Sequence, residues 1–233
     1  MAHIIKKEVA MSNVPKTTDL IDLNHTKAAY ALEGCEYPWQ ILPRISEIIY
    51  EIGKELPKSE YESPEEGIWI AKSAKVAKSA YIGSPCIIGS GTEVRHCAFI
   101  RGSALVGDGA VIGNSVELKN CIICDGAQIP HYNYVGDSLI GYRAHMGAGA
   151  VTSNVKSDKS LVCVKAHDEV IETGLKKFGA ILGDHAEIGC GAVLNPGSIV
   201  GRRSSVYPQV SLRGVVPPDS IVKSENNTVK RKA

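Results

Sequence analysis

The sequence predicts an all-β protein: a left-handed parallel β-helix of hexapeptide repeats, with an N-terminal helical cap and a protruding hairpin. The first observation is a period of six, which neither strand alternation nor the helical period produces. The second is that a small residue and a turn follow each aliphatic one, as in Ile82-Gly-Ser-Pro-Cys. Three short strands and three turns then form an 18-residue triangular coil, which buries its inner face by stacking on the next. The periodic aliphatic residues are Ile70, Val76, Ile82, Ile88, Val94, Ile100, Val106, Ile112 and Leu118.

The period returns, after an interruption, from Leu182 to Leu212. Between the two runs the spacing falls to five, from Val135 to Ile140. A solenoid that omits a residue bends its coil at that point, and such irregularities often serve a site. The irregularity coincides with the most unusual polar cluster of the chain.

Residues 1–68 are expected to form a helical cap and a linker. No strong period is present up to about position 35. From Tyr37 the apolar residues follow one helical stripe, and Pro38 suits a first helical turn. A solenoid needs protection at its open end, so we expect this helix to cover that end. A specific docking device is the alternative. The stripe consists of Ile41, Leu42, Ile45, Ile48, Ile49, Ile52 and Leu56.

Residues 69–222 are expected to form the β-helix, with an arm inserted at 155–180. Within the arm, Leu161-Val-Cys-Val, a polar turn and Val170-Ile predict a hairpin that leaves the solenoid. Long segments that leave a rigid scaffold commonly carry function. The basic residues 223–233 are expected to form a flexible tail.

Composition argues against several classes of partner. The net charge is +1, which gives no general attraction to nucleic acid or to an anionic membrane. No apolar run reaches the ~20 residues that cross a bilayer, and Met1 leads into charged residues rather than an export signal. The seven cysteines are then expected to be reduced thiols of a cytoplasmic protein. The pair Cys121 and Cys124 is expected to be buried rather than to bind zinc.

Three large cations stand where the repeat calls for a small residue: Arg95, Arg101 and Lys119. Arg101 and Lys119 are 18 residues apart, so they lie on successive coils about 5 Å from one another. They repel each other unless an anion lies between them, and a phosphate is the obvious candidate because arginine binds it bidentately. The alternative is that both side chains simply extend into solvent.

Two histidines, His131 and His145, lie near the irregular coil. His131 follows the stacked cations by about one coil, which makes it a candidate general base. The segment Gly147-Ala-Gly-Ala offers backbone amides that a ligand can approach closely.

Three motifs resemble a known family: Asn114-Ser-Val-Glu-Leu-Lys119, His131-Tyr-Asn-Tyr134-Val-Gly-Asp137 and Gly147-Ala-Gly-Ala-Val-Thr-Ser-Asn154. Over residues 69–217 the chain resembles the acetyltransferase half of the bifunctional enzymes that make UDP-N-acetylglucosamine, and the β-helix domains of sugar-1-phosphate nucleotidyltransferases. The resemblance implies an acetyl-CoA-dependent N-acetyltransferase of an amino-sugar 1-phosphate. It also implies a homotrimer with sites at subunit edges and no metal. Residues 1–68 are too few for the uridyltransferase half.

The resemblance assigns roles to individual positions. The catalytic base falls on His131, and the residue whose backbone receives the acetyl-CoA thioester falls on Ala148. The chain departs from the family at His145, which replaces a sugar-contacting asparagine, and at Cys190, which replaces a serine that contacts acetyl-CoA. A later sugar-phosphate-binding lysine corresponds to Lys156 or Lys159. The other substrate-binding positions are Arg101, Lys119, Tyr134 and Asn154.

Two other functions remain open at this point. The first is a non-catalytic trimer that senses a nucleotide sugar or serves a separate nucleotidyltransferase, and His145 favours it. The second is a zinc enzyme resembling the β-helical carbonic anhydrases, suggested by His96 and His131, which are 35 residues apart. That family's additional histidine pair is missing, and a catalytic zinc usually has three protein ligands.

Overall fold

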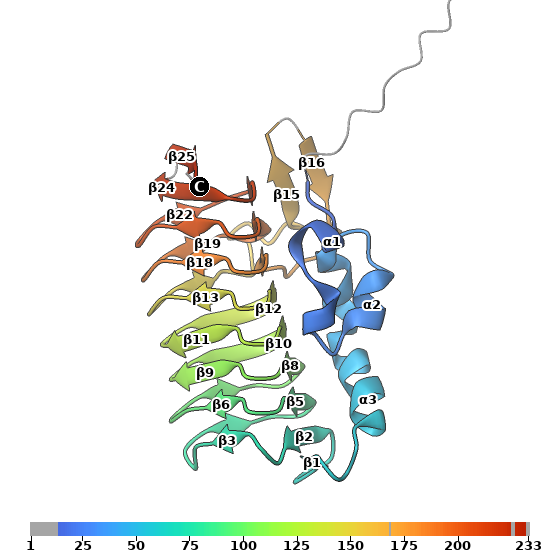
Figure 1. Cartoon of the computed structure of the whole chain (residues 1–233). Helices are drawn as coiled ribbons and strands as arrows, with labels where there is room; N and C mark the ends of the chain where they lie inside the picture. The colour runs from blue at the N-terminus through green and yellow to red at the C-terminus, as the bar shows by residue number, and fades with distance from the viewer. Residues whose placement is uncertain (1–13, 168, 225–226, 232–233) are drawn as a thin grey trace, which may run out of the picture.

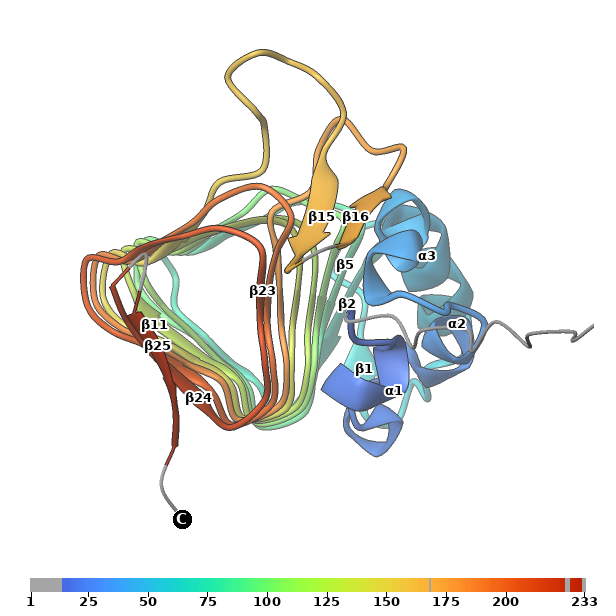
Figure 2. The same ribbon diagram turned by 90° about the horizontal axis from the view of Figure 1, so that it is seen from above.

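The computed structural model describes residues 14–167, 169–224 and 227–231, and it confirms the parallel β-helix. Figure 1 shows the coils stacked along one axis, and Figure 2 shows the triangular outline of the prism. Parallel pairing between successive coils builds its three faces.

Each face is a ladder of short strands, and two long strands contribute to two faces. Face A contains β2 (Ile68–Ala71), β5 (Cys86–Ile88), β8 (Ala104–Val106), the second half of β10 (Glu117–Ile123) and of β12 (Tyr134–Ile140), β17 (Ala180–Leu182), β20 (Ser198–Val200) and β23 (Val215–Val216). Face B contains β3 (Lys75–Val76), β6 (Glu93–Val94), β9 (Val111–Asn114), β11 (Gln128–His131), β13 (His145–Met146), β18 (Glu187–Ile188), β21 (Ser205–Val206) and β24 (Ser220–Ser224). Face C contains β4 (Tyr81–Ile82), β7 (Phe99–Ile100), the first halves of β10 and β12, β14 (Val151–Thr152), β19 (Val193–Leu194) and β22 (Ser211–Leu212).

The six-residue period fills the interior of the prism. Its aliphatic residues from Ile88 to Val222 form one continuous buried cluster. Where the spacing falls to five, β10 and β12 run across a corner as single seven-residue strands. Leu118 pairs with Val135, so these coils contain 17 residues instead of 18. Asn120 and Asp137 turn that corner, each with a φ of 48°.

The helical segment packs along the side of the prism, which corrects the expectation that it covers an open end (Figure 2). The physical reason is a second apolar stripe, on the outside of face A, that the six-residue period does not reveal. Burying a large aliphatic side chain contributes about 1.5–3 kcal/mol, so this stripe provides a strong docking surface. Its fully buried members are Ile87, Leu105, Ile122, Leu139, Ile181 and Ile199.

The helical segment consists of α1 (Thr17–Leu20), η1 (Leu23–His25), α2 (Ala29–Glu33), η2 (Pro38–Arg44) and α3 (Ile45–Glu55). The helix expected from Tyr37 is present, but its first part is the 3₁₀-helix η2, and the α-helix begins only at Ile45. Pro43 lies inside η2, and proline cannot donate the backbone hydrogen bond that an α-helix would need there.

The chain leaves the solenoid after β14 and returns at β17, which pairs directly with β12. The expected hairpin is confirmed: β15 (Cys163–Ala166) and β16 (Glu169–Glu172) are antiparallel. In the expected linker, which precedes the first coil, β1 (Tyr61–Glu62) pairs with β2. The C-terminal segment differs from the expected flexible tail, because β25 (Asn227–Lys230) forms an antiparallel pair with β24.

Candidate active site

The predicted site residues lie mainly on the two edges that border face C. The cation edge, between faces C and A, carries Arg101, Lys119, Asp137 and Asn154. The histidine edge, between faces B and C, carries His131, Ala148 and Cys190. Backbone pairing between successive coils places the residues of each edge above one another.

On the cation edge, each cation is paired with a carboxylate of the chain itself. Arg101 Nη1 donates to Glu117 Oε1 at 2.8 Å, and Lys119 Nζ lies 3.3 Å from Asp137 Oδ2. These carboxylates supply the negative charge that stacked cations require. The Glu117 side chain is 35 % exposed, whereas that of Asp137 is 6 % exposed. An incoming phosphate can therefore displace Glu117 from Arg101, but Asp137 stays beside Lys119.

Tyr134 leans from face C toward the cation edge. Asn154 Nδ2 donates to the Tyr134 hydroxyl at 3.2 Å and also to Asp137 Oδ2. The ring lies across Gly136, where a Cβ atom would stand 2.3 Å from the Tyr134 hydroxyl oxygen. Partial burial raises the pKa of Tyr134, and the charges of Asp137 and Glu117 raise it further. The phenol thus remains protonated at neutral pH and can donate a hydrogen bond to an anion.

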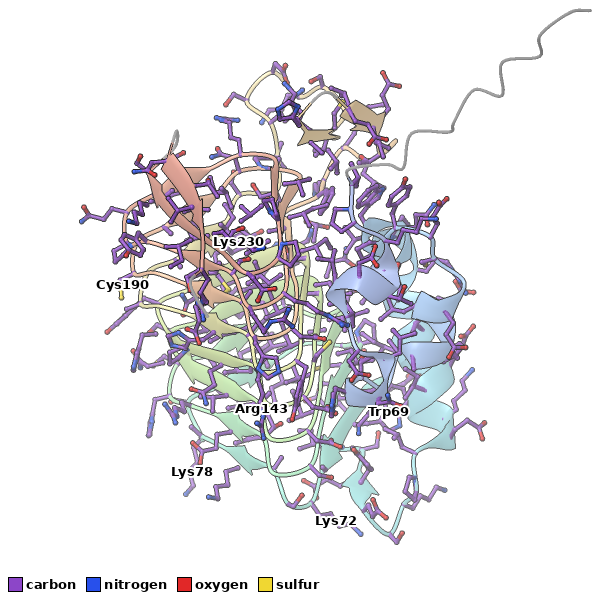
Figure 3. The ribbon with its side chains drawn as sticks, turned by 45° about the horizontal axis from the view of Figure 1, so that its top comes forward. Trp69, Lys72, Lys78, Arg143, Cys190 and Lys230 are labelled. Atoms are coloured by element: carbon purple, nitrogen blue, oxygen red, sulfur yellow. The ribbon has the colours of Figure 1, made fainter. Side chains whose placement is uncertain are left out.

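On the histidine edge, three predicted residues occupy successive coils. The Gly149 N–H donates to the His131 carbonyl at 3.0 Å, and the Gly191 N–H donates to the Ala148 carbonyl at 2.8 Å. Figure 3 shows the neighbouring Cys190 on an outer edge of the prism. His131, Ala148 and Cys190 are all exposed, so this edge can accept a ligand.

Asn133 fixes the histidine edge, and the sequence interpretation missed it. Its side chain is buried and donates to the carbonyls of Gly147 and Ala150, at 2.7 and 3.0 Å. Its amide oxygen accepts from the His131 N–H at 3.1 Å. One buried amide therefore holds the turn that carries the candidate base against the turn that carries Ala148. The sequence did contain a signal for this role, because Asn133 is a polar residue at a turn position of the motif from His131 to Asp137.

The two edges are separate within one chain. They are joined by the strand residues Tyr134 to Gly136, and three extended residues span about 10 Å. Among the described residues, no hydrogen bond or ion pair joins the His131 imidazole to Arg101 or Lys119. A single chain thus presents the candidate base and the cations on opposite borders of face C.

His145 and Lys156 lie away from both groups. His145 is on face B, where its Nδ1 lies 3.1 Å from Glu187 Oε2. Lys156 is at the start of the arm, with its Nζ 3.7 Å from Asp158 Oδ2. It borders a hollow of about 240 Å³ that Arg213 also lines.

The geometry does not favour zinc. His96 and His131 lie on the histidine edge two coils apart, with Asn114 between them. Across the part of the chain that the structure describes, no group of three or more His, Cys, Asp or Glu residues is arranged to hold a metal ion. Cys121 and Cys124 are both fully buried, which confirms the expected packing role. No helix in the same ranges is long and apolar enough to cross a membrane.

Sequence relatives point to one kind of protein. A bifunctional sugar-1-phosphate nucleotidylyltransferase/acetyltransferase of Sulfurisphaera tokodaii is 36 % identical over 87 residues, which is 37 % of this chain and 22 % of the relative. A bifunctional protein GlmU of Methanococcus aeolicus is 32 % identical over 112 residues, 48 % of this chain and 27 % of the relative. The match thus spans about a quarter of these curated relatives. No family model matches the chain.

Two solved structures contain a coil similar to that of this chain. Perosamine N-acetyltransferase from Caulobacter crescentus, determined with CoA and GDP-perosamine, has a TM-score of 0.35 and 18 % identity, over 66 % of this chain and 51 % of that one. A hexapeptide transferase family protein from Anaplasma phagocytophilum has a TM-score of 0.41 and 15 % identity, over 72 % and 82 %.

Proposed function

We propose that this protein is an acetyl-CoA-dependent N-acetyltransferase that acts on an amino-sugar 1-phosphate of the glucosamine-1-phosphate type, in cytoplasmic nucleotide-sugar synthesis. The observation that carries the proposal is the histidine edge, where exposed His131, the turn of Ala148 and the exposed thiol of Cys190 lie on three successive coils. The similarity to bifunctional nucleotidylyltransferase/acetyltransferases supports the same chemistry.

The proposed reaction uses His131 as a general base. Its imidazole takes a proton from the sugar ammonium, and the freed amine attacks the thioester carbonyl of acetyl-CoA. The Ala148 N–H has no hydrogen-bond acceptor among the described residues, so it can donate to the oxyanion that forms. Collapse of this intermediate breaks the carbon–sulfur bond, the imidazolium returns its proton to the departing thiolate, and the second proton of the former ammonium leaves the nitrogen to water. Arg101, Lys119 and Tyr134 hold the phosphate.

The separation of the two edges favours a site completed by two copies of the chain. In a homotrimer, which the family resemblance implies, we propose that the cation edge of one copy faces the histidine edge of its neighbour. This arrangement brings the phosphate-binding cations to the base without moving the strand between Tyr134 and Gly136. Sugar phosphate, acetyl-CoA and base then meet at a subunit boundary.

The first test replaces His131 with alanine and follows thiol release from acetyl-CoA with glucosamine 1-phosphate as acceptor. We expect the rate to fall about 10²–10⁴-fold. His96→Ala is the matched control, because His96 lies on the same edge and has no role in the proposed acetyl transfer. Equal activity of the His131 and His96 variants would rule out His131 as the base.

The shared site has its own test. The His131→Ala and Lys119→Ala variants are mixed, unfolded and refolded together. If each site combines two chains, some mixed trimers hold one intact site and activity returns. No recovery, with trimers present by light scattering, would place the base and the cations of each site in one chain.

The second candidate is a non-catalytic module that binds a sugar phosphate or nucleotide sugar. The observation that favours this module is His145, which replaces the family's asparagine and contacts Glu187. Calorimetry separates the two functions. Binding of the sugar phosphate with no detectable binding of acetyl-CoA would support the module and exclude the transferase.

A further inference from the structure

Asp137 is a buried carboxylate at the centre of the cation edge. Its oxygens receive the Lys119 ammonium at 3.3 Å, the Asn120 amide at 2.9 Å and the Asn154 amide. Only 4 % of the residue is exposed, so neither water nor a ligand easily replaces these partners. A buried carboxylate this well satisfied is a rigid element of the structure.

The partners of Asp137 come from separate parts of the chain. Asn120 also donates to the carbonyl of Leu42 in the helical segment, at 3.2 Å. Asn154 stands where the arm leaves the solenoid, and Gly179, where the arm returns, donates its N–H to the Asp137 carbonyl at 2.8 Å. Asp137 therefore connects the cation edge, the helical segment and both ends of the arm.

The backbone explains why the side chain points inward. Asp137 turns its corner in one residue with a φ of 48°, a left-handed conformation that aspartate tolerates better than most residues. The turn removes one residue from the coil and directs the carboxylate between Lys119 and Asn154. The irregular spacing in the sequence and the polar cluster thus have the same structural origin.

We propose that Asp137 is the positioning residue of this site: it fixes Lys119 directly, and Tyr134 through Asn154, in the arrangement that the acceptor phosphate requires. This inference rests on the proposed transferase function. Asp137 itself repels a phosphate, so its removal does not weaken the overall attraction of the edge for an anion. What its removal loses is orientation, which governs turnover when reacting groups must be held in place.

The test is Asp137→Asn, which keeps the shape and removes the charge. We expect kcat with glucosamine 1-phosphate to fall about tenfold or more, while KM for this acceptor stays constant or decreases. The matched control is Asp184→Asn. Asp184 is equally buried, at 3 % exposure, and receives the N–H groups of Asp22 and Tyr142 and a guanidinium nitrogen of Arg202 on another edge of the prism. The Asp184→Asn protein should be less stable than the wild type but keep its kcat.

A second variant guards against misfolding. Asn120→Gly removes one partner of Asp137, together with the bond to the Leu42 carbonyl, keeps the left-handed φ and alters no side chain assigned to the chemistry. It should lower kcat about threefold, again without raising KM. Unchanged kcat in both variants, or a loss of kcat in Asp184→Asn as large as in Asp137→Asn, would overturn the inference. If the wild-type protein transfers no acetyl group, the proposed function fails and this inference fails with it.

Discussion

Gly113 in β9 lies against the backbone of the next coil, and replacing it with alanine tests how closely the coils are packed. A Cβ atom at this position would stand 1.6 Å from the Pro130 carbonyl oxygen, and 2.1 and 2.4 Å from the Pro130 C and Cα atoms. All three are backbone atoms of β11, so no side-chain rotation relieves the overlap. Gly113→Ala must push β9 and β11 apart immediately before His131.

The cost follows from the geometry. Ordinary contact begins at 3.4 Å, so the strands must separate locally by about 1.8 Å, the difference between 3.4 and 1.6 Å. That displacement breaks the adjacent hydrogen bonds of the β9–β11 ladder, each worth about 0.5–1.5 kcal/mol, and it opens the packing of the core beneath. We expect the free energy of unfolding to fall by about 2–5 kcal/mol.

Gly109→Ala is the control. Gly109 has a φ of +62°, and no atom lies within 4 Å of a Cβ built there. Its replacement brings only backbone strain, about 1–2 kcal/mol. The measurement is denaturant unfolding of both variants at one protein concentration, because assembly changes apparent stability. A Gly113→Ala protein as stable as the Gly109→Ala protein would refute the close approach of β9 and β11. Acetyl transfer should also fall in Gly113→Ala only, since Pro130 precedes His131.

Three further predictions concern the two edges. Acetyl-CoA should slow alkylation of Cys190 but not of Cys97; both thiols are exposed, and only Cys190 lies beside the proposed cofactor site. Gly136→Ala should displace the ring of Tyr134 and raise KM for the sugar phosphate severalfold, with kcat less affected, because the phosphate loses a hydroxyl donor. Glu117→Gln should strengthen binding of inorganic phosphate by about two- to fivefold in calorimetry, because it removes the carboxylate that competes with phosphate for the Arg101 guanidinium.

Each of these predictions has a contradicting outcome. Equal protection of Cys97 and Cys190 would place the cofactor elsewhere. A Gly136→Ala protein with an unchanged KM would mean that the Tyr134 hydroxyl does not hold the acceptor. Weaker phosphate binding in Glu117→Gln would show that the carboxylate orders Arg101 for the ligand instead of blocking it. The expected gain in phosphate affinity of Glu117→Gln should shrink in high salt, because the Arg101–Glu117 pair is exposed.

The helical segment shows which part of the fold the sequence could predict and which it could not. The stripe from Ile41 to Leu56 identified a helix with one buried side, because helical periodicity is a local property. It did not identify the surface that this side contacts. The helix docks on an apolar stripe on the outside of face A, which includes Ile122 and Leu139. These two residues are one coil of 17 residues apart, so their spacing does not follow the six-residue period.

By itself, the sequence determined the β-helix, the hairpin arm and the stacking of Arg101 next to Lys119, because these follow from the six-residue period and from distances along the chain. Only the tertiary structure decided what surrounds those groups. Glu117 and Asp137 neutralise the cations, and His131 stands on the other border of face C. The physical reason is that charge pairing and burial depend on neighbours across coils, edges and the helical segment, whereas a repeat specifies only the path of the backbone.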